Sequence, residues 1–289
     1  MPSLSRILLP VDFSERAAGA ARCARVLAQH FSSEIVLLHV LAPLEYQSGG
    51  AEMAGIPLGD VYRSQAEQAA TDLEQFRRKE LAAFNARCVV REGEPASRIV
   101  EFAHAENVDL ILMPTHGYGP FRRFILGSST AKVLHDAECP VWTGVHMAEA
   151  PAQASPSPRH ILCALDLGPQ SEHAFAWADW LSRQFGARLT AMHATAAIPD
   201  TGDRSEETWR ANLRWSGQNE LERLRESVGS GAELLLEAGD PAKSICAAAT
   251  RIGADLLVIG RGSAAGGFGR LRTNAYAIIR QSPCPVVSV

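Results

Sequence analysis

The fold of this chain is decided by a stretch that occurs twice, Arg6-Ile-Leu-Leu-Pro-Val-Asp12 and His160-Ile-Leu-Cys-Ala-Leu-Asp166. Both copies place an apolar run directly before an aspartate, and they lie 166 − 12 = 154 positions apart. A short apolar run bounded by turn residues is typical of a strand buried on both faces. The repeat therefore predicts that the same strand, followed by an aspartate, opens two related domains.

Four further matches follow in the same order in both halves, and the offset falls from 154 to 239 − 93 = 146 and then 284 − 139 = 145. Ordered matches with a slowly falling offset indicate a duplicated domain. We expect domains over 1–147 and 159–289, joined by an Ala-, Pro- and Ser-rich linker over 148–158. The matching segments are His39 with His193, Gly93–Ser97 with Gly239–Lys243, Asp109–Met113 with Asp255–Ile259, and Cys139–Val141 with Cys284–Val286.

Short apolar runs alternate with helical patterns along the first copy. Because right-handed crossovers are almost obligatory, this alternation implies a parallel sheet. We expect two tandem doubly wound α/β domains, each a five-stranded parallel sheet in the order 3-2-1-4-5 with helices on both faces. The expected strands are 7–11, 34–40, 87–91, 110–113 and 141–145, and the expected helices are 14–31, one around 66–76, one opening at 95, and 128–136.

Composition excludes several classes of function. The 289 residues are 46% hydrophobic and 21% charged, with a net charge of −4 and no dense basic stretch, so we expect a globular protein without a nucleic-acid partner. No apolar run approaches the roughly 18 residues of a membrane span, and five apolar residues before Asp12 are too few for a signal peptide. Six scattered cysteines form no CxxC motif. We therefore expect a cytoplasmic protein with reduced thiols and no membrane partner.

The ligand crevice of a doubly wound sheet lies at the carboxyl ends of the strands where the winding reverses. Two segments fall there, Pro10–Asp12 after the first strand and Met113–Gly117 after the fourth. Nine residues, 118–126, then lead to Gly127-Ser-Ser129 at a helix start. Free amides at a helix start favour phosphate, and a glycine lets the anion approach the backbone. This position favours a phosphate site, although a serine that merely caps the helix is the alternative.

In combination these motifs resemble the universal stress protein family, whose ATP-binding members carry glycine, two residues, glycine, nine residues, and Gly-Ser/Thr after the fourth strand. The resemblance covers both halves and includes Leu37–Val40 and the Cys-Pro-Val at 139–141. The spacing is intact, but a proline replaces the first glycine and removes one amide donor. The resemblance implies ATP as the ligand of the first domain, either alone or with Mg²⁺. The implied contacts are Asp12 and Val40 at the adenine or ribose, Pro10 and Met113 as the adjoining wall, Pro114 in place of the first glycine, and Gly117, Gly127, Ser128 and Ser129 at the phosphates.

Some of these polar residues have structural alternatives. Asp12 could cap the following helix, and His39 is expected to be a satisfied core residue. His116 could bond phosphate or only stabilise its turn. Arg122 and Arg123 could reach terminal phosphates, but we favour a solvated surface position for both.

The second copy departs from the pattern at the phosphate end. It keeps Asp166, but Arg272 stands where the first copy has Gly127, and Ala194 replaces Val40. A side chain at that turn would occupy the space where phosphate meets the backbone. We expect the second domain to have lost ATP binding, although the arginine could ligate an anion from another direction.

The sequence shows no catalytic triad, P-loop or paired metal carboxylates, so we expect no catalytic residues and no metal ligands. The leading hypothesis is a stress-response protein that binds ATP in its first domain and acts through nucleotide-dependent conformation or association. A nucleotide-free scaffold and a slow ATPase are the alternatives. Because related family proteins pair through their last strand, the resemblance also implies that the two copies form an internal pseudo-dimer, with a homodimer as a further option.

Overall fold

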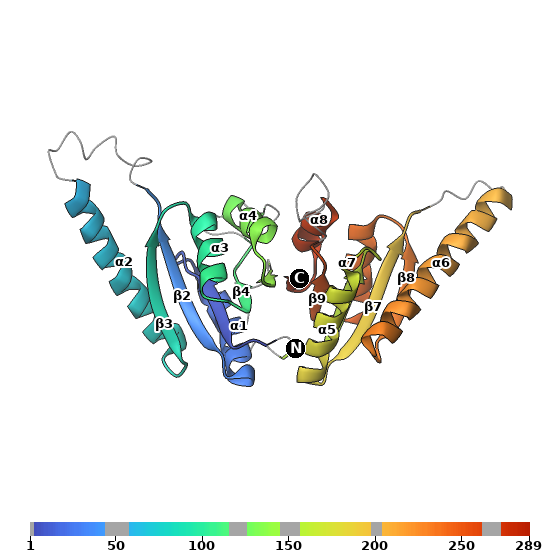
Figure 1. Ribbon diagram of the computed structural model, residues 1–289, viewed down its shortest axis with the longest axis horizontal. Coiled ribbons are helices and arrows are strands. Elements are labelled where there is room, and N and C mark those ends of the chain that lie inside the picture. The colour runs from blue at the N-terminus through green and yellow to red at the C-terminus, as the bar shows by residue number, and fades with distance from the viewer. Residues whose placement is uncertain (1–2, 44–57, 116–125, 145–156, 198–203, 262–272) are drawn as a thin grey trace. The chain divides into compact units, whose positions relative to one another are not determined.

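The computed structural model describes residues 3–43, 58–115, 126–144, 157–197, 204–261 and 273–289. The chain divides into two compact units, whose main segments are Ser3–Trp142 and Pro156–Val289. Strand and helix alternate along each unit (Figure 1). Most of the expected linker, 148–156, lies outside the described residues.

The first domain has five strands and four helices in its described residues. Its strands pair in parallel in the order β3-β2-β1-β4-β5, which confirms the expected doubly wound topology. Helix α1 packs against α2, and α3 packs against α4, so that each face of the sheet is covered by a helix pair. The elements are β1 (Arg6–Pro10), α1 (Glu15–Phe31), β2 (Glu34–Leu41), α2 (Leu58–Leu81), β3 (Ala86–Glu92), α3 (Pro95–Ala105), β4 (Leu110–Leu112), α4 (Ser128–Asp136) and β5 (Val141–Thr143).

The second domain repeats this arrangement. Its strands are also parallel, in the order β8-β7-β6-β9-β10, which is again 3-2-1-4-5 when counted from the first strand of the domain. The elements are β6 (His160–Leu165), α5 (Ser171–Phe185), β7 (Arg188–Thr195), α6 (Arg204–Val228), β8 (Glu233–Ala238), α7 (Pro241–Ile252), β9 (Leu256–Ile259), α8 (Thr273–Gln281) and β10 (Val286–Ser288).

The core explains why the repeated stretch decides the fold. Strand β1 lies between β2 and β4, and Ile7, Leu8 and Leu9 are fully buried. Burying one such side chain stabilises the fold by about 1.5–3 kcal/mol. Ala20 and Ala24 of α1 are also fully buried, so small side chains face the core on this helix. The central strand therefore fixes the position of the residues that follow it.

The start of α1 corrects one alternative reading of the sequence. Ser14 is the N-cap of this helix, and its hydroxyl oxygen accepts a hydrogen bond from the amide of Ala17. The interpretation of Asp12 as the helix cap is therefore wrong. Asp12 instead lies two residues before the cap.

Among the described residues, no helix is long and apolar enough to cross a bilayer. The six cysteines, all of which lie in the described segments, form no disulfides.

Candidate functional site

A pocket of about 230 Å³ opens at the carboxyl ends of β1, β2 and β4 in the first domain. This is the place where the winding of the sheet reverses, because β1 has β2 on one side and β4 on the other. Helices α3 and α4 complete the wall. The lining residues are Pro10, Val11, Asp12, Leu38, His39, Val40, Pro95, Ile99, Met113, Pro114, Ser129 and Thr130.

The pocket brings together most of the residues that the sequence nominated. Gly127 and Ser128 stand directly before Ser129 at the start of α4, beside the pocket lining rather than in it. Gly117 lies outside the described residues, as do His116, Arg122 and Arg123. The nominated residues that line the pocket are Pro10, Asp12, Val40, Met113, Pro114 and Ser129.

The carboxylate of Asp12 is held by the turn that follows it. Its Oδ1 accepts hydrogen bonds from the backbone amide of Ser14 at 3.0 Å and from the Ser14 hydroxyl at 2.6 Å. Phe13, between them, has a φ of 61°, a left-handed conformation that a bulky side chain rarely adopts. The equivalent Leu167 of the second domain has a φ of 57°. The same strained turn is thus built into both copies, and it fixes the direction of the aspartate.

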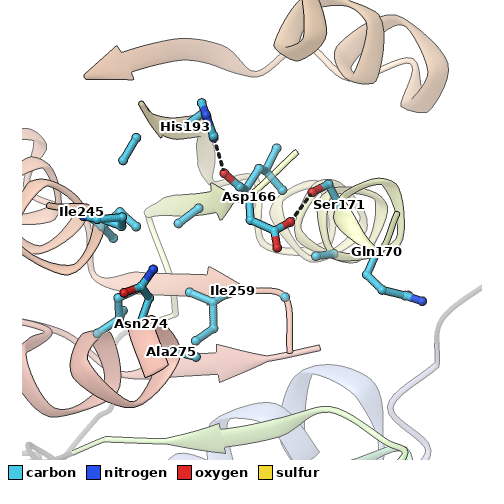
Figure 2. Close-up of a pocket in the computed structure, with 15 residues that line it drawn as sticks. Asp166, Gln170, Ser171, His193, Ile245, Ile259, Asn274 and Ala275 are labelled. Atoms are coloured by element: carbon cyan, nitrogen blue, oxygen red, sulfur yellow. Dashed lines mark hydrogen bonds between the residues drawn. The ribbon is translucent and has the colours of Figure 1, made fainter. Parts of the chain in front are cut away.

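His39 connects the two central strands at the pocket. Its Nδ1 lies 2.7 Å from the carbonyl oxygen of Val11, and its ring lies 4.6 Å from the ring of Phe13. A carbonyl oxygen only accepts hydrogen bonds, so Nδ1 carries the proton. His193 makes the same contact with the carbonyl of Leu165 at 2.8 Å (Figure 2). His39 is half-buried and hydrogen-bonded, and it also forms part of the pocket wall.

Helix α4 begins at the pocket without a side-chain cap. Gly127 is its N-cap and forms no side-chain capping bond, so Ser128 is the first helical residue and the reading of a serine as the cap is wrong. The Gly127 amide donates to the carbonyl of Thr115 at 2.8 Å, and the Thr130 hydroxyl donates to the carbonyl of Pro114 at 3.1 Å. These two bonds hold the helix start against the end of β4. The amides of the first turn are suited to an anion.

The lysine of α4 is already paired. Lys132 of α4 contacts Glu94 and the hydroxyl of Ser97, each at 2.9 Å. Glu94 caps α3, and the hydrogen bond from the Ser97 hydroxyl, aided by Lys132 and two backbone amides, lowers its pKa to about 2. The same pairing raises the pKa of Lys132. Lys132 therefore serves the α3–α4 contact in this structure.

Sequence reasoning missed the contribution of α3. Pro95 and Ile99 line the first pocket, and their counterparts Pro241 and Ile245 line the pocket of the second domain. The repeat of the Gly-Glu-Pro-Ala segment at an offset of 146 was the available signal. Nothing in the pattern showed which face of the helix meets the carboxyl ends of the strands.

The second domain has an equivalent pocket of about 220 Å³ at the carboxyl ends of β6, β7 and β9. Figure 2 shows Asp166 between Ser171 of α5 and the side chains of Ile259 and Asn274. The Oδ1 atom of Asp166 accepts from the amide of Gly168 at 2.9 Å and from the hydroxyl of Ser171 at 3.0 Å. The lining residues are Ala164, Leu165, Asp166, Gln170, Ser171, Ala174, His193, Ala194, Pro241, Ile245, Ile259, Gly260, Asn274, Ala275 and Ile278.

In the part of the chain that the structure describes, no three His, Cys, Asp or Glu residues are grouped so that they could hold a metal ion. The described lining of the two pockets therefore offers no metal centre. Each pocket instead combines one carboxylate and one histidine with apolar walls. Such a lining suits an organic ligand that carries hydrogen-bond donors.

Comparisons with known proteins agree with this architecture. The model of the universal stress protein family matches residues 4–143 and 158–289. A universal stress protein of Mycolicibacterium smegmatis is 29% identical over 220 residues, which cover 72% of this chain and 71% of the relative. One from Methanocaldococcus jannaschii is 28% identical over 136 residues, covering 47% of this chain and 79% of the relative. The crystal structure of a universal stress protein from Archaeoglobus fulgidus covers 99% of this chain and 96% of its own at a TM-score of 0.71 and 24% identity, a likeness of fold.

Proposed function

Because the chain belongs to the universal stress protein family, we propose that it is a cytoplasmic stress-response protein whose first domain binds ATP. The observation that supports this most is that the uncapped start of α4 and the carboxylate of Asp12 adjoin one pocket. Helix amides attract phosphate, and a carboxylate accepts from ribose hydroxyls or from the adenine amine. Cysteines without disulfides agree with a reducing compartment.

The lining residues suggest how the nucleotide is oriented. Val40 and Met113 supply apolar wall for the base, while Asp12 is fixed by its bonds to Ser14. The phosphates would lie toward Gly127–Ser129. The residues described at that end offer amides and hydroxyls but no carboxylate cluster, so Mg²⁺ would be held mainly by the phosphates and water.

We propose that the protein acts through nucleotide-dependent conformation or association and has at most weak ATPase activity. Hydrolysis requires a group that positions the attacking water near the terminal phosphate. Asp12 lies at the other end of the proposed nucleotide, at the carboxyl end of β1. The described lining therefore supports retention of the ligand rather than its rapid turnover.

Calorimetric titration with ATP tests this proposal. Gly127→Arg places a side chain where phosphate would meet the backbone and should abolish binding. Gly59→Arg is the matched control, because Gly59 lies in α2 with no atom within 4 Å of an added Cβ. ATP binding that survives Gly127→Arg would contradict the assignment. Protein that binds no nucleotide would favour a scaffold, and turnover at roughly 1–100 s⁻¹ would favour an enzyme.

The internal pairing of the two copies stays a prediction. The last strand of the first domain, β5, pairs with β4, and the last strand of the second domain, β10, pairs with β9. We propose that the copies associate through these last strands, because strand edges favour pairing. Deleting Val286–Val289 should then loosen the pair and promote association between molecules, measured by sedimentation. An unchanged sedimentation profile would argue against pairing through this edge.

A further inference from the structure

The long helix α6 of the second domain has an inward and an outward face. Among its described side chains, Gly217 and Leu221 are buried. A Cβ added at Gly217 would lie 3.0 Å from Leu236 of β8 and 3.5 Å from Thr195, the last residue of β7. The helix therefore passes the carboxyl end of β7 at Gly217, and its preceding turns extend beyond the strands (Figure 1).

The outward face of those preceding turns exposes two tryptophans. Trp209 is 59% exposed and Trp215 is 71% exposed, and they are the exposed large hydrophobic side chains in the part of the chain that the structure describes. Spacings of three and four residues place side chains on one side of a helix. The tryptophan face, as we call it, consists of five exposed and uncharged residues, Thr208, Trp209, Asn212, Trp215 and Ser216. Apolar surface gathered in this way marks an interaction site more often than isolated apolar residues do.

The charges of α6 lie elsewhere on the helix. Arg210 and Arg214 stand two positions before and after Asn212, which places them on the opposite side. Arg223 and Glu226 are exposed on the outward side, but in the carboxyl-terminal half of the helix. A membrane surface or a nucleic acid would require lysine or arginine on the face itself. The tryptophan face instead fits an uncharged protein surface that carries aromatic and polar groups.

The tryptophan face is symmetric about Asn212, and this symmetry identifies the partner. Trp209 and Trp215 lie three positions before and after Asn212, and Thr208 and Ser216 lie four positions before and after it. In two such helices packed antiparallel about a two-fold axis at Asn212, Trp209 of one copy lies level with Trp215 of the other, and Thr208 lies level with Ser216. We propose that the tryptophan face binds a second copy of this chain in this antiparallel arrangement.

Each polar group of the face has a matching group in a second copy. The Asn212 amide contains both donors and an acceptor, so two copies of it on the axis can bond each other. The hydroxyls of Thr208 and Ser216 also donate and accept. Two chains of net charge −4 repel each other, and an uncharged face lets them approach with no like charges opposed.

The exposed area of the tryptophans predicts a weak dimer. A buried aromatic side chain covers roughly 150–250 Å², so at these exposures the two tryptophans of one copy can lose roughly 200–330 Å², and the four of a dimer roughly 400–650 Å². Specific interfaces bury about 1,200 Å² or more in total. The polar residues of the helix must supply the remainder, and we therefore expect association that depends on protein concentration.

Sedimentation velocity of the full chain over a range of micromolar concentrations tests the inference. The wild type should form a dimer as its concentration rises. Asn212→Arg places two like charges on the axis and should abolish the dimer, and Trp215→Ser should weaken it about thirtyfold or more, as expected for an interface hot spot. Ser64→Arg is the matched control, because it adds the same charge at an exposed position of α2 and should dimerise like the wild type. Circular dichroism verifies that each variant folds.

A mixing experiment tests the antiparallel arrangement itself. Asn212→Glu should be monomeric for the same reason as Asn212→Arg, but an equimolar mixture of the two variants should form a heterodimer, because the side chain on the axis faces its own counterpart. A wild type that stays monomeric, or a dimer that Asn212→Arg leaves intact, would overturn the inference. A mixture that does not associate would overturn it too. The inference does not rest on nucleotide binding, so these outcomes are independent of the ATP titrations.

Discussion

Replacing Ser14 by alanine should destabilise the first domain and disturb its pocket at the same time. The Ser14 side chain is 9% exposed, accepts from the amide of Ala17 at 3.3 Å and donates to Asp12 at 2.6 Å. Loss of an N-cap costs about 1 kcal/mol, and loss of a hydrogen bond to a charged group costs about 1.5–3 kcal/mol. Because Asp12 is half-exposed and can rebind water, we expect a total somewhat below the sum of these two costs, about 2 kcal/mol.

The second domain supplies the matched control. Ser171 is 2% exposed and donates to Asp166 at 3.0 Å, but the N-cap of α5 is Gln170, so Ser171 is not a cap. Asp166 is also more exposed than Asp12. Ser171→Ala therefore loses one hydrogen bond without a cap, and we expect a cost of about 1 kcal/mol.

Hydrogen exchange followed by mass spectrometry can assign each loss to its own domain. Amides of α1 should lose protection in Ser14→Ala, and amides of α5 should lose less in Ser171→Ala. In a domain of this size about 1 kcal/mol corresponds to roughly 3 °C in Tm, so calorimetry should show shifts of about 6 and 3 °C. Equal shifts, or no shift for Ser14→Ala, would refute the reasoning that Ser14 both caps the helix and holds Asp12.

Three further predictions concern acid stability, thiol reactivity and the hydrogen bond of His39 at the pocket. Glu94 has a folded pKa of about 2, so its stabilising contribution is present above about pH 4.5 and is lost as the pH falls toward 2; Glu94→Gln should flatten the acid unfolding curve over that interval. Burial raises the pKa of the Cys163 thiol, so a thiol reagent should modify it at neutral pH only on unfolding, and modification at the rate of an exposed thiol would contradict this. His39→Leu removes the bond to the carbonyl of Val11 and should destabilise the first domain by about 1 kcal/mol, measured by urea unfolding; an unchanged midpoint would mean that water replaces the bond.

The sequence determined the features that depend on local pattern. Runs such as Ile7–Leu9 are apolar without alternation because a central parallel strand is buried on both faces, and this is visible without coordinates. The duplication placed Asp12 and Asp166 at the same topological position. Strand order then followed from general rules of connection, which is why the pocket could be located at the carboxyl ends of β1 and β4.

Tertiary structure decided the features that depend on which surfaces meet. Pro95 and Ile99 line the pocket because one face of α3 packs across the strand ends, and a helix pattern shows that a face is apolar but not what it contacts. Ser14 rather than Asp12 caps α1 because the left-handed turn at Phe13 moves the helix start two residues on. The second domain has a pocket although its phosphate motif has diverged, because the walls of the pocket come from strands and helices that the core holds in place. The sequence alone does not show that these walls are independent of the motif.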